Sequence, residues 1–137
     1  MNEQKGEWVM QKRKILLDVP HTGLLEKTKD IKENCEGWID ELHHITYRED
    51  EKTTVKLIVD ENSLTIERSA ENQTRIILRK EGKSEAWMNT EFGEFFFDVR
   101  ADYIKTSRKM ISTQYSLMQG KQLINQVHIR WIIKEEQ

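Results

Sequence analysis

Apolar and polar side chains alternate with a period of two along much of this sequence, and that pattern restricts what the chain can fold into. Val55, Leu57 and Val59 share one parity, and the pattern resumes at Leu64 after the turn-like segment 60–63. Successive side chains of a strand point to opposite faces, so the pattern predicts strands that each bury one face. The Asp, Asn and Ser residues between the two runs predict a hairpin.

The same pattern recurs through the rest of the chain, whereas helical periodicity is weak. About eight to ten short strands joined by tight turns, without long crossovers, favour an all-β fold. We expect a closed or nearly closed antiparallel β-barrel, mostly up-and-down. Residues 24–37 fit a strand, a loop or a helix. Besides the hairpin, strands are predicted over Lys14–Val19, Ile39–Tyr47, Gln73–Leu78, Ser84–Asn89, Glu94–Ala101, Ile111–Leu117 and Ile124–Ile133.

The domain organisation follows from length and pattern. A chain of 137 residues fits one domain. Residues 1–11 lack a pattern, which predicts a flexible N-terminal tail before a single barrel domain over residues 12–137. The one proline, Pro20, has no backbone N–H to donate, so we expect it at a sheet edge or a bulge.

Charge and hydropathy narrow the class of protein. Twenty-two basic and 24 acidic residues leave a net charge of -2, so no strong field attracts nucleic acid or an anionic membrane. The longest apolar runs are triplets such as Ile15–Leu17, too short to span a membrane as a helix. Residues 1–10 do not read as a secretory signal. Cys35 is the only cysteine, which allows a reducing compartment. We expect a cytoplasmic protein that binds neither nucleic acid nor membranes.

No motif for a metal, a cofactor or a nucleophilic catalyst is evident. His43 and His44 are adjacent, so on a strand they point to opposite faces and cannot easily bind one ion. The six glycines form neither a GxGxxG nor a Walker loop, and no Gly-x-Ser-x-Gly is present. We therefore predict no metal site, no cofactor and no catalytic residue.

One cluster of polar residues is predicted to turn inward. Tyr47 and Glu49 share a strand face, and Arg68 continues the apolar face of Leu64 and Ile66. An unpaired charge is costly inside a barrel, so we expect Glu49 and Arg68 to pair. The pair either anchors the polar end of a ligand, with Tyr47 beside it, or is an internal salt bridge that only specifies register.

The aromatic residues form a larger set with two interpretations. They line a pocket for an apolar ligand, or they pack the core of a small barrel whose interior is filled by side chains. Phe97 and Tyr115 join Tyr47, Glu49 and Arg68 as the predicted ligand-binding residues. The full aromatic set is Trp38, Trp87, Phe92, Phe95, Phe97, Tyr115 and Trp131.

Five short segments stand in a characteristic order and spacing: Ile45–Glu49, Thr53–Leu57, Leu64–Arg68, Thr90–Gly93 and Tyr115–Leu117. In that order and spacing they resemble the YwiB-like family of Firmicutes. This resemblance covers roughly residues 14–133 and implies a bacterial protein with a calycin-like, lipocalin-related β-barrel. It implies no reaction, because the family is a domain of unknown function.

Three hypotheses for function follow. The leading one is a non-enzymatic binder of a small, partly apolar molecule. The alternative is a structural or protein-interaction module whose barrel is filled by side chains, and it predicts an exposed apolar patch or a dimer interface. A weaker alternative is an enzyme that uses Glu49 as a general acid or base beside Arg68. The sequence leaves open whether the protein is a monomer or a dimer.

Overall fold

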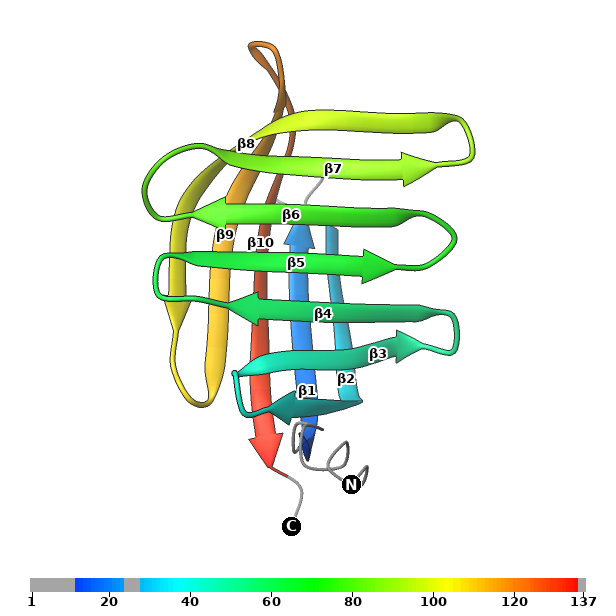
Figure 1. Cartoon of the computed structure of the whole chain (residues 1–137), viewed down its shortest axis with the longest axis vertical. Coiled ribbons are helices and arrows are strands. Elements are labelled where there is room, and N and C mark those ends of the chain that lie inside the picture. Colours follow the sequence, from blue (N-terminus) through cyan, green and yellow to red (C-terminus); the bar gives the residue numbers. More distant parts are fainter. Residues whose placement is uncertain (1–11, 24–27, 136–137) are drawn as a thin grey trace, which may run out of the picture.

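The computed structural model describes residues 12–23 and 28–135, so the predicted tail over residues 1–11 lies outside the described residues (Figure 1). Within the described residues, ten antiparallel strands close into a barrel in which each strand pairs with its neighbours in sequence and β1 pairs with β10. The predicted all-β, up-and-down barrel is confirmed. The strands are β1 (Lys12–Gly23), β2 (Thr28–Asp40), β3 (His44–Asp50), β4 (Thr53–Val59), β5 (Ser63–Ser69), β6 (Gln73–Arg79), β7 (Ser84–Thr90), β8 (Gly93–Thr106), β9 (Met110–Gln119) and β10 (Gln122–Glu135).

Two long strands change partners along their length and thereby form the corners of the barrel. The first half of β8 pairs with β7 up to Val99, and its second half pairs with β9 from Asp98 onward. Strand β2 pairs with β1 along most of its length but meets β3 through only three residue pairs, Gly37 to Ile39. As a result β3–β7 run across β1, β2, β9 and β10 (Figure 1), as in crossed packing of two sheets.

The corner between β2 and β3 requires a glycine. A Cβ atom at Gly37 would lie 2.8 Å from the carbonyl oxygen of Thr46 and 2.9 Å from Cβ of Tyr47. It would also lie 3.0 Å from Leu17 in the core. The absence of a side chain therefore lets β2 cross close to β3.

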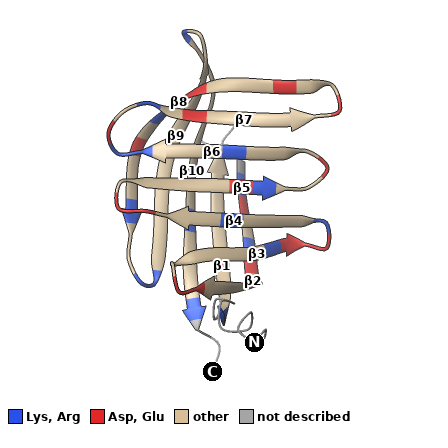
Figure 2. Ribbon diagram, in the orientation of Figure 1, with Lys and Arg blue, Asp and Glu red and all other residues tan. Residues whose placement is uncertain are grey.

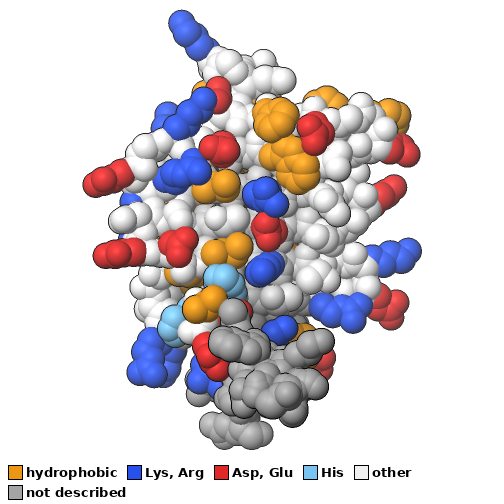
Figure 3. All heavy atoms as spheres, viewed as in Figure 1, with side chains coloured by type: hydrophobic (Ala, Val, Ile, Leu, Met, Phe, Trp, Pro, Cys, Tyr) orange, Lys and Arg blue, Asp and Glu red, His pale blue; other side chains and the backbone are white. Residues whose placement is uncertain are grey.

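Alternation along the strands produces the core. The predicted apolar face of the last strand is buried at Val127, Trp131 and Ile133. The hairpin formed by β4 and β5 buries Leu57 and Leu64 completely. Acidic and basic residues are interspersed along the strands and turns (Figure 2). Hydrophobic side chains gather over β7 and β8 on the face seen in Figure 3.

The structure corrects the sequence prediction for one segment and decides it for another. The predicted strand over 39–47 is broken: β2 ends at Asp40, whose carboxylate accepts hydrogen bonds from the backbone N–H groups of Leu42 (2.9 Å) and His44 (3.0 Å). His43 completes the turn with φ 62°. The segment left open upstream is a strand from Thr28 onward.

Pro20 lies close to a bulge, as its missing donor predicts. The register between β1 and β2 shifts between Leu17 and Val19. The part of the chain that the structure describes contains no helix long and apolar enough to cross a membrane.

Candidate functional site

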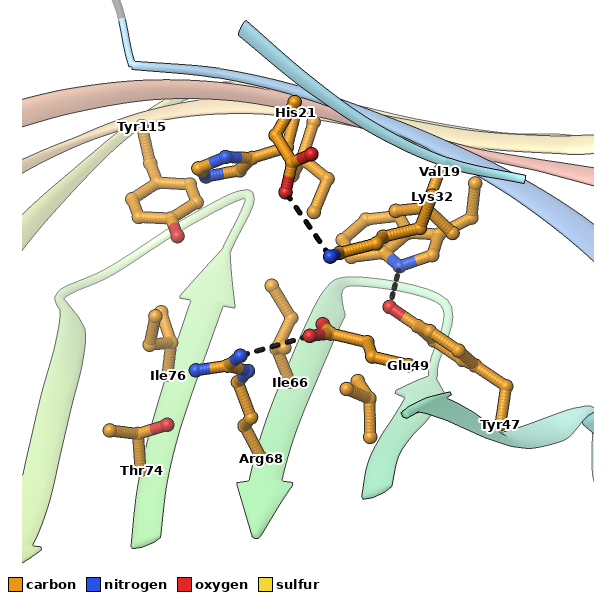
Figure 4. A pocket seen from close by; sticks show the side chains of 14 residues that line it. Val19, His21, Lys32, Tyr47, Glu49, Ile66, Arg68, Thr74, Ile76 and Tyr115 are labelled. Atoms are coloured by element: carbon orange, nitrogen blue, oxygen red, sulfur yellow. Dashed lines mark hydrogen bonds and ion pairs between the residues drawn. The ribbon is translucent and has the colours of Figure 1, made fainter. Parts of the chain in front are cut away.

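A cavity of about 290 Å³ opens at one mouth of the barrel (Figure 4). Both crossed sheets contribute to its wall, which is apolar inside and carries charged groups towards the opening. The apolar part consists of Val19, Val55, Ile66, Ile76, Ile129 and the ring of Trp131, and the polar part of His21, Asp30, Lys32, Tyr47, Glu49, Arg68, Thr74 and Tyr115.

The inner end of the cavity is fixed by a buried hydrogen bond between the two sheets. Nε1 of Trp131 on β10 donates to the hydroxyl oxygen of Tyr47 on β3 at 2.8 Å, and both side chains are almost fully buried. Burial raises the pKa of the Tyr47 phenol, so it stays neutral. Tyr47 is therefore a neutral part of the cavity wall, and its hydroxyl oxygen already accepts a hydrogen bond from Trp131.

An ion pair lies at the mouth. Nη2 of Arg68 donates to Oε2 of Glu49 at 2.9 Å, with the Glu49 side chain 16% exposed and that of Arg68 50% exposed. Donating this hydrogen bond to Glu49 raises the pKa of the Arg68 guanidinium, which keeps it charged. Arg68 follows Ile66 on the inner face of β5, so the charged pair continues an otherwise apolar row.

Tyr115 supplies a hydrogen-bond donor that faces the cavity. Its side chain is only 7% exposed, and Figure 4 shows its hydroxyl group pointing into the cavity. No described residue forms a hydrogen bond with that hydroxyl group. Burial raises the pKa of Tyr115 to about 12, so at neutral pH the group is a neutral phenol that can donate.

A bulge brings Lys32 and Asp30 into the cavity. Cys35 is buried on the inner face of β2, and strict alternation would place residues 33 and 31 on the same face. Asn34 adopts φ 53°, and the register shift between β1 and β2 pairs Val19 with Lys32. The parity therefore changes: Lys32 and Asp30 line the cavity, with Nζ and Oδ2 3.7 Å apart, and Ile31 is exposed.

Three polar side chains hold that bulge from outside. Asp18 accepts a hydrogen bond from the backbone N–H of Asn34 at 2.9 Å and forms an ion pair with Nζ of Lys134 at 2.9 Å. The same Lys134 Nζ donates to Oδ1 of Asn34 at 2.7 Å. The backbone bond and Lys134 lower the pKa of Asp18, so it is ionised at neutral pH.

The structure brings four of the five predicted ligand-binding residues to one cavity: Tyr47, Glu49, Arg68 and Tyr115. Phe97 does not line it. It is half-buried on the inner face of β8, opposite Ala86, and lines a separate groove beside the barrel corner. Strand β8 begins to pair with β9 at Asp98, and Phe97 lies before this corner, away from the cavity mouth.

Sequence reasoning missed His21, Asp30, Lys32 and Thr74. His21 has no partner in a motif, and the lysine and aspartate depend on a one-residue bulge that alternation does not reveal. A useful signal was Asn34, because asparagine tolerates a positive φ better than most residues. Of the aromatic set, only Tyr115 and Trp131 line the cavity.

His43 lies in the turn between β2 and β3, and His44 is the first residue of β3. His43 is exposed and His44 is half-buried, with Nδ1 of His44 3.8 Å from Oδ2 of Asp40. Among the described residues, no three His, Cys, Asp or Glu side chains are grouped so that they could hold a metal ion.

Comparison with known proteins places this barrel. A family model described as a domain of unknown function (DUF1934) matches residues 25–130. The chain belongs to this family. The structure is also similar to the crystal structure of the YwiB protein from Bacillus subtilis, with a TM-score of 0.70 and 13% sequence identity over 96% of this chain and 99% of that chain. No curated protein matches the sequence. The predicted YwiB-like resemblance is confirmed, and the structural likeness shows the shared fold.

Proposed function

We propose that the cavity at the barrel mouth binds a small, partly apolar molecule. Ile66, Ile76 and Ile129 offer an apolar wall for the body of the ligand, and the charged groups offer a wet, polar opening. A volume of about 290 Å³ lies at the lower end of the range of about 300–1,000 Å³ that is typical of small-molecule sites. The ligand is therefore small.

The hydroxyl group of Tyr115 carries this proposal. This hydroxyl group faces the cavity, so water in the cavity can accept from it in the free protein. A ligand oxygen or nitrogen that accepts from Tyr115 can replace that water without losing the hydrogen bond. The ligand therefore has an acceptor close to its apolar part.

The charged groups at the mouth do not require a charged ligand, because they are paired with one another. Arg68 is paired with Glu49, and Lys32 lies beside Asp30, so each cation already has a carboxylate nearby. Such pairs can also open to hydrogen-bond a polar end that reaches the opening. The cavity thus fits both an alcohol and a carboxylate with the same short alkyl chain.

Two probes with one tail test the proposal: octanoate and 1-octanol, titrated into the protein and followed by amide NMR shifts. We expect saturable shifts at β5, β6 and β9 around Ile66, Ile76 and Tyr115. Ile76→Phe fills the cavity and should abolish them, whereas Ile77→Phe on the outer face of the same strand is the matched control. No saturable shift with either probe, or equal binding by the two variants, would refute the cavity as a binding site.

The donor is tested separately by Tyr115→Phe. Removing one neutral hydrogen bond of about 1 kcal/mol predicts a roughly fivefold rise in Kd for the better probe. Tyr103→Phe, at a half-buried tyrosine outside the cavity, is the control. An unchanged Kd would show that Tyr115 does not hold the ligand. Native mass spectrometry of the freshly purified protein then searches for the molecule that the cell supplies.

A further inference from the structure

The first half of β8 has a free edge. Gly93–Phe97 pairs with β7 on one side, and β9 joins β8 only from Asp98 onward. The backbone N–H and C=O groups along the other side of these five residues therefore pair with none of the strands that the structure describes. We refer to Gly93–Phe97 as the β8 edge, and it lies above β7 in Figure 1.

The β8 edge lacks most of the features that keep exposed strands apart. It contains no lysine, no proline and no bulge, and Glu94 is its one charged residue. Phe92 beside it is 84% exposed, Phe96 69% and Phe95 45%. At about 200 Å² a ring, they expose roughly 400 Å², about half of what one partner buries in a standard interface.

A groove begins where the edge ends. It has a volume of about 300 Å³ and lies between β8 and the β9–β10 hairpin, lined by Phe96, Phe97, Asp98, Met118 and Gly120 among others. An apolar side chain delivered beside Asp98 would enter it.

We propose that a second copy of this chain adds its β8 edge to this one, antiparallel and about a two-fold axis at Phe95. The register sets Phe95 against its own copy and Glu94 against Phe96 of the second copy. It also sets Gly93 against Phe97 of the second copy, where the missing side chain leaves room for the ring. The backbone groups of both edges are then paired, and the two barrels share one continuous sheet.

The edge is complementary to itself in this register, which is the reason to commit to a second copy. The register continues so that Phe92 of the second copy comes to lie beside Asp98, at the groove. The alternative axis at Phe96 would oppose Glu94 to Asp98 of the second copy, and like charges directly opposite destabilise a sheet. The rings, the glycine and the groove are used twice, once by each copy, as a two-fold interface requires.

Sedimentation equilibrium of four variants tests the proposal. Wild type should sediment at twice the mass of one chain. Phe96→Glu opposes two glutamates across each half of the interface, so we expect its dimer Kd to rise by about tenfold or more. Phe96→Lys places a lysine opposite Glu94 of the second copy and should dimerise better than Phe96→Glu. The double variant Glu94→Lys/Phe96→Glu restores an opposite-charge pair and should recover the dimer.

Leu42→Glu is the matched control, because Leu42 is 54% exposed in the turn after β2. It should not alter the mass. Circular dichroism and thermal unfolding establish that each variant is folded. In wild type, amide hydrogen exchange of residues 93–97 should slow as concentration rises.

The outcomes separate clearly. A wild-type monomer at several hundred micromolar overturns the proposal, and so does a dimer that Phe96→Glu leaves intact. If both Phe96→Glu and Phe96→Lys dissociate the dimer, the axis at Phe95 is wrong. Exchange protection elsewhere with an unprotected β8 edge would assign the dimer to another surface.

Discussion

The two corners of the barrel each leave a strand segment with one free side, and the two segments differ in chemistry. Strand β2 before Gly37 pairs with β1 alone, and β8 before Asp98 pairs with β7 alone. The segment of β2 carries charged residues and a bulge at Asn34, whereas the β8 edge carries three consecutive phenylalanines.

The difference shows that the same feature, a strand that crosses from one sheet to the other, can produce two kinds of surface. Crossing from one sheet to the other always leaves unpaired backbone groups. Charges and a bulge on β2 make pairing with another chain unfavourable, and the bulge also turns Lys32 into the cavity. The aromatic β8 edge has neither device. One free edge therefore carries the features that protect an exposed strand, and the other lacks them.

The largest effect is expected where β2 leaves β3. Gly37→Ala pushes a Cβ atom to within 2.8 Å of the Thr46 carbonyl oxygen, a backbone atom that cannot rotate away. We expect the free energy of unfolding, measured in urea, to fall by about 3 kcal/mol, the upper end of typical overpacking costs.

Gly82→Asn provides the comparison, because a Cβ atom there meets nothing within 4 Å and asparagine tolerates the positive φ. If both substitutions cost the same, the close crossing at Gly37 does not stabilise the corner.

A smaller effect is expected at the bulge of β2. Asn34 has φ 53°, which costs alanine about 1 kcal/mol more than glycine. Asn34→Ala should therefore be less stable than Asn34→Gly by about that amount, although both lose the hydrogen bond to Lys134. If the bulge is what turns Lys32 inward, Asn34→Ala should also weaken octanoate binding more than Asn34→Gly. Equal stability of the two variants would contradict a conformational role for Asn34.

The smallest effect is a pH dependence at Asp18. Its pKa is lowered in the folded protein by the Asn34 N–H and by Lys134. The stabilisation from this group is thus present above the unfolded-state pKa of 3.8 and is lost as the pH falls through the lower folded-state value. Asp18→Asn should flatten the loss of stability below about pH 4 in urea titrations. Asp60→Asn, which changes the net charge equally, is the control, and an identical slope in wild type and Asp18→Asn would refute the linkage.

Alternation sufficed to predict the barrel because most strands obey it without interruption. In β4 and β5 the buried residues Val55, Leu57 and Leu64 are those that the sequence pattern selects. The same rule misled at the turn after β2. Ile39 and Ile45 have the same parity, so the pattern continues through a break that the Asp40 carboxylate creates.

The candidate site was predictable only where it lies on regular strands. Parity along the strands predicts the inward orientation of Tyr47, Glu49 and Arg68. Lys32 has the wrong parity and lines the cavity only because of the bulge. Phe97 has the right parity and lies outside the cavity, because β8 leaves the sheet just beyond it. The local pattern of the sequence predicts whether a side chain points inward or outward. It does not predict which part of the barrel interior that side chain reaches.

The hydrogen bond between Tyr47 and Trp131 has a consequence for how the chain folds. Its two partners are 84 residues apart, and β1 likewise has to wait for β10 before its second side is paired. Contacts between distant residues form slowly, since a long loop must close first. We therefore expect the barrel to close late in folding, when β10 docks between β1 and β9. The same docking brings Trp131 to Tyr47 and buries both rings.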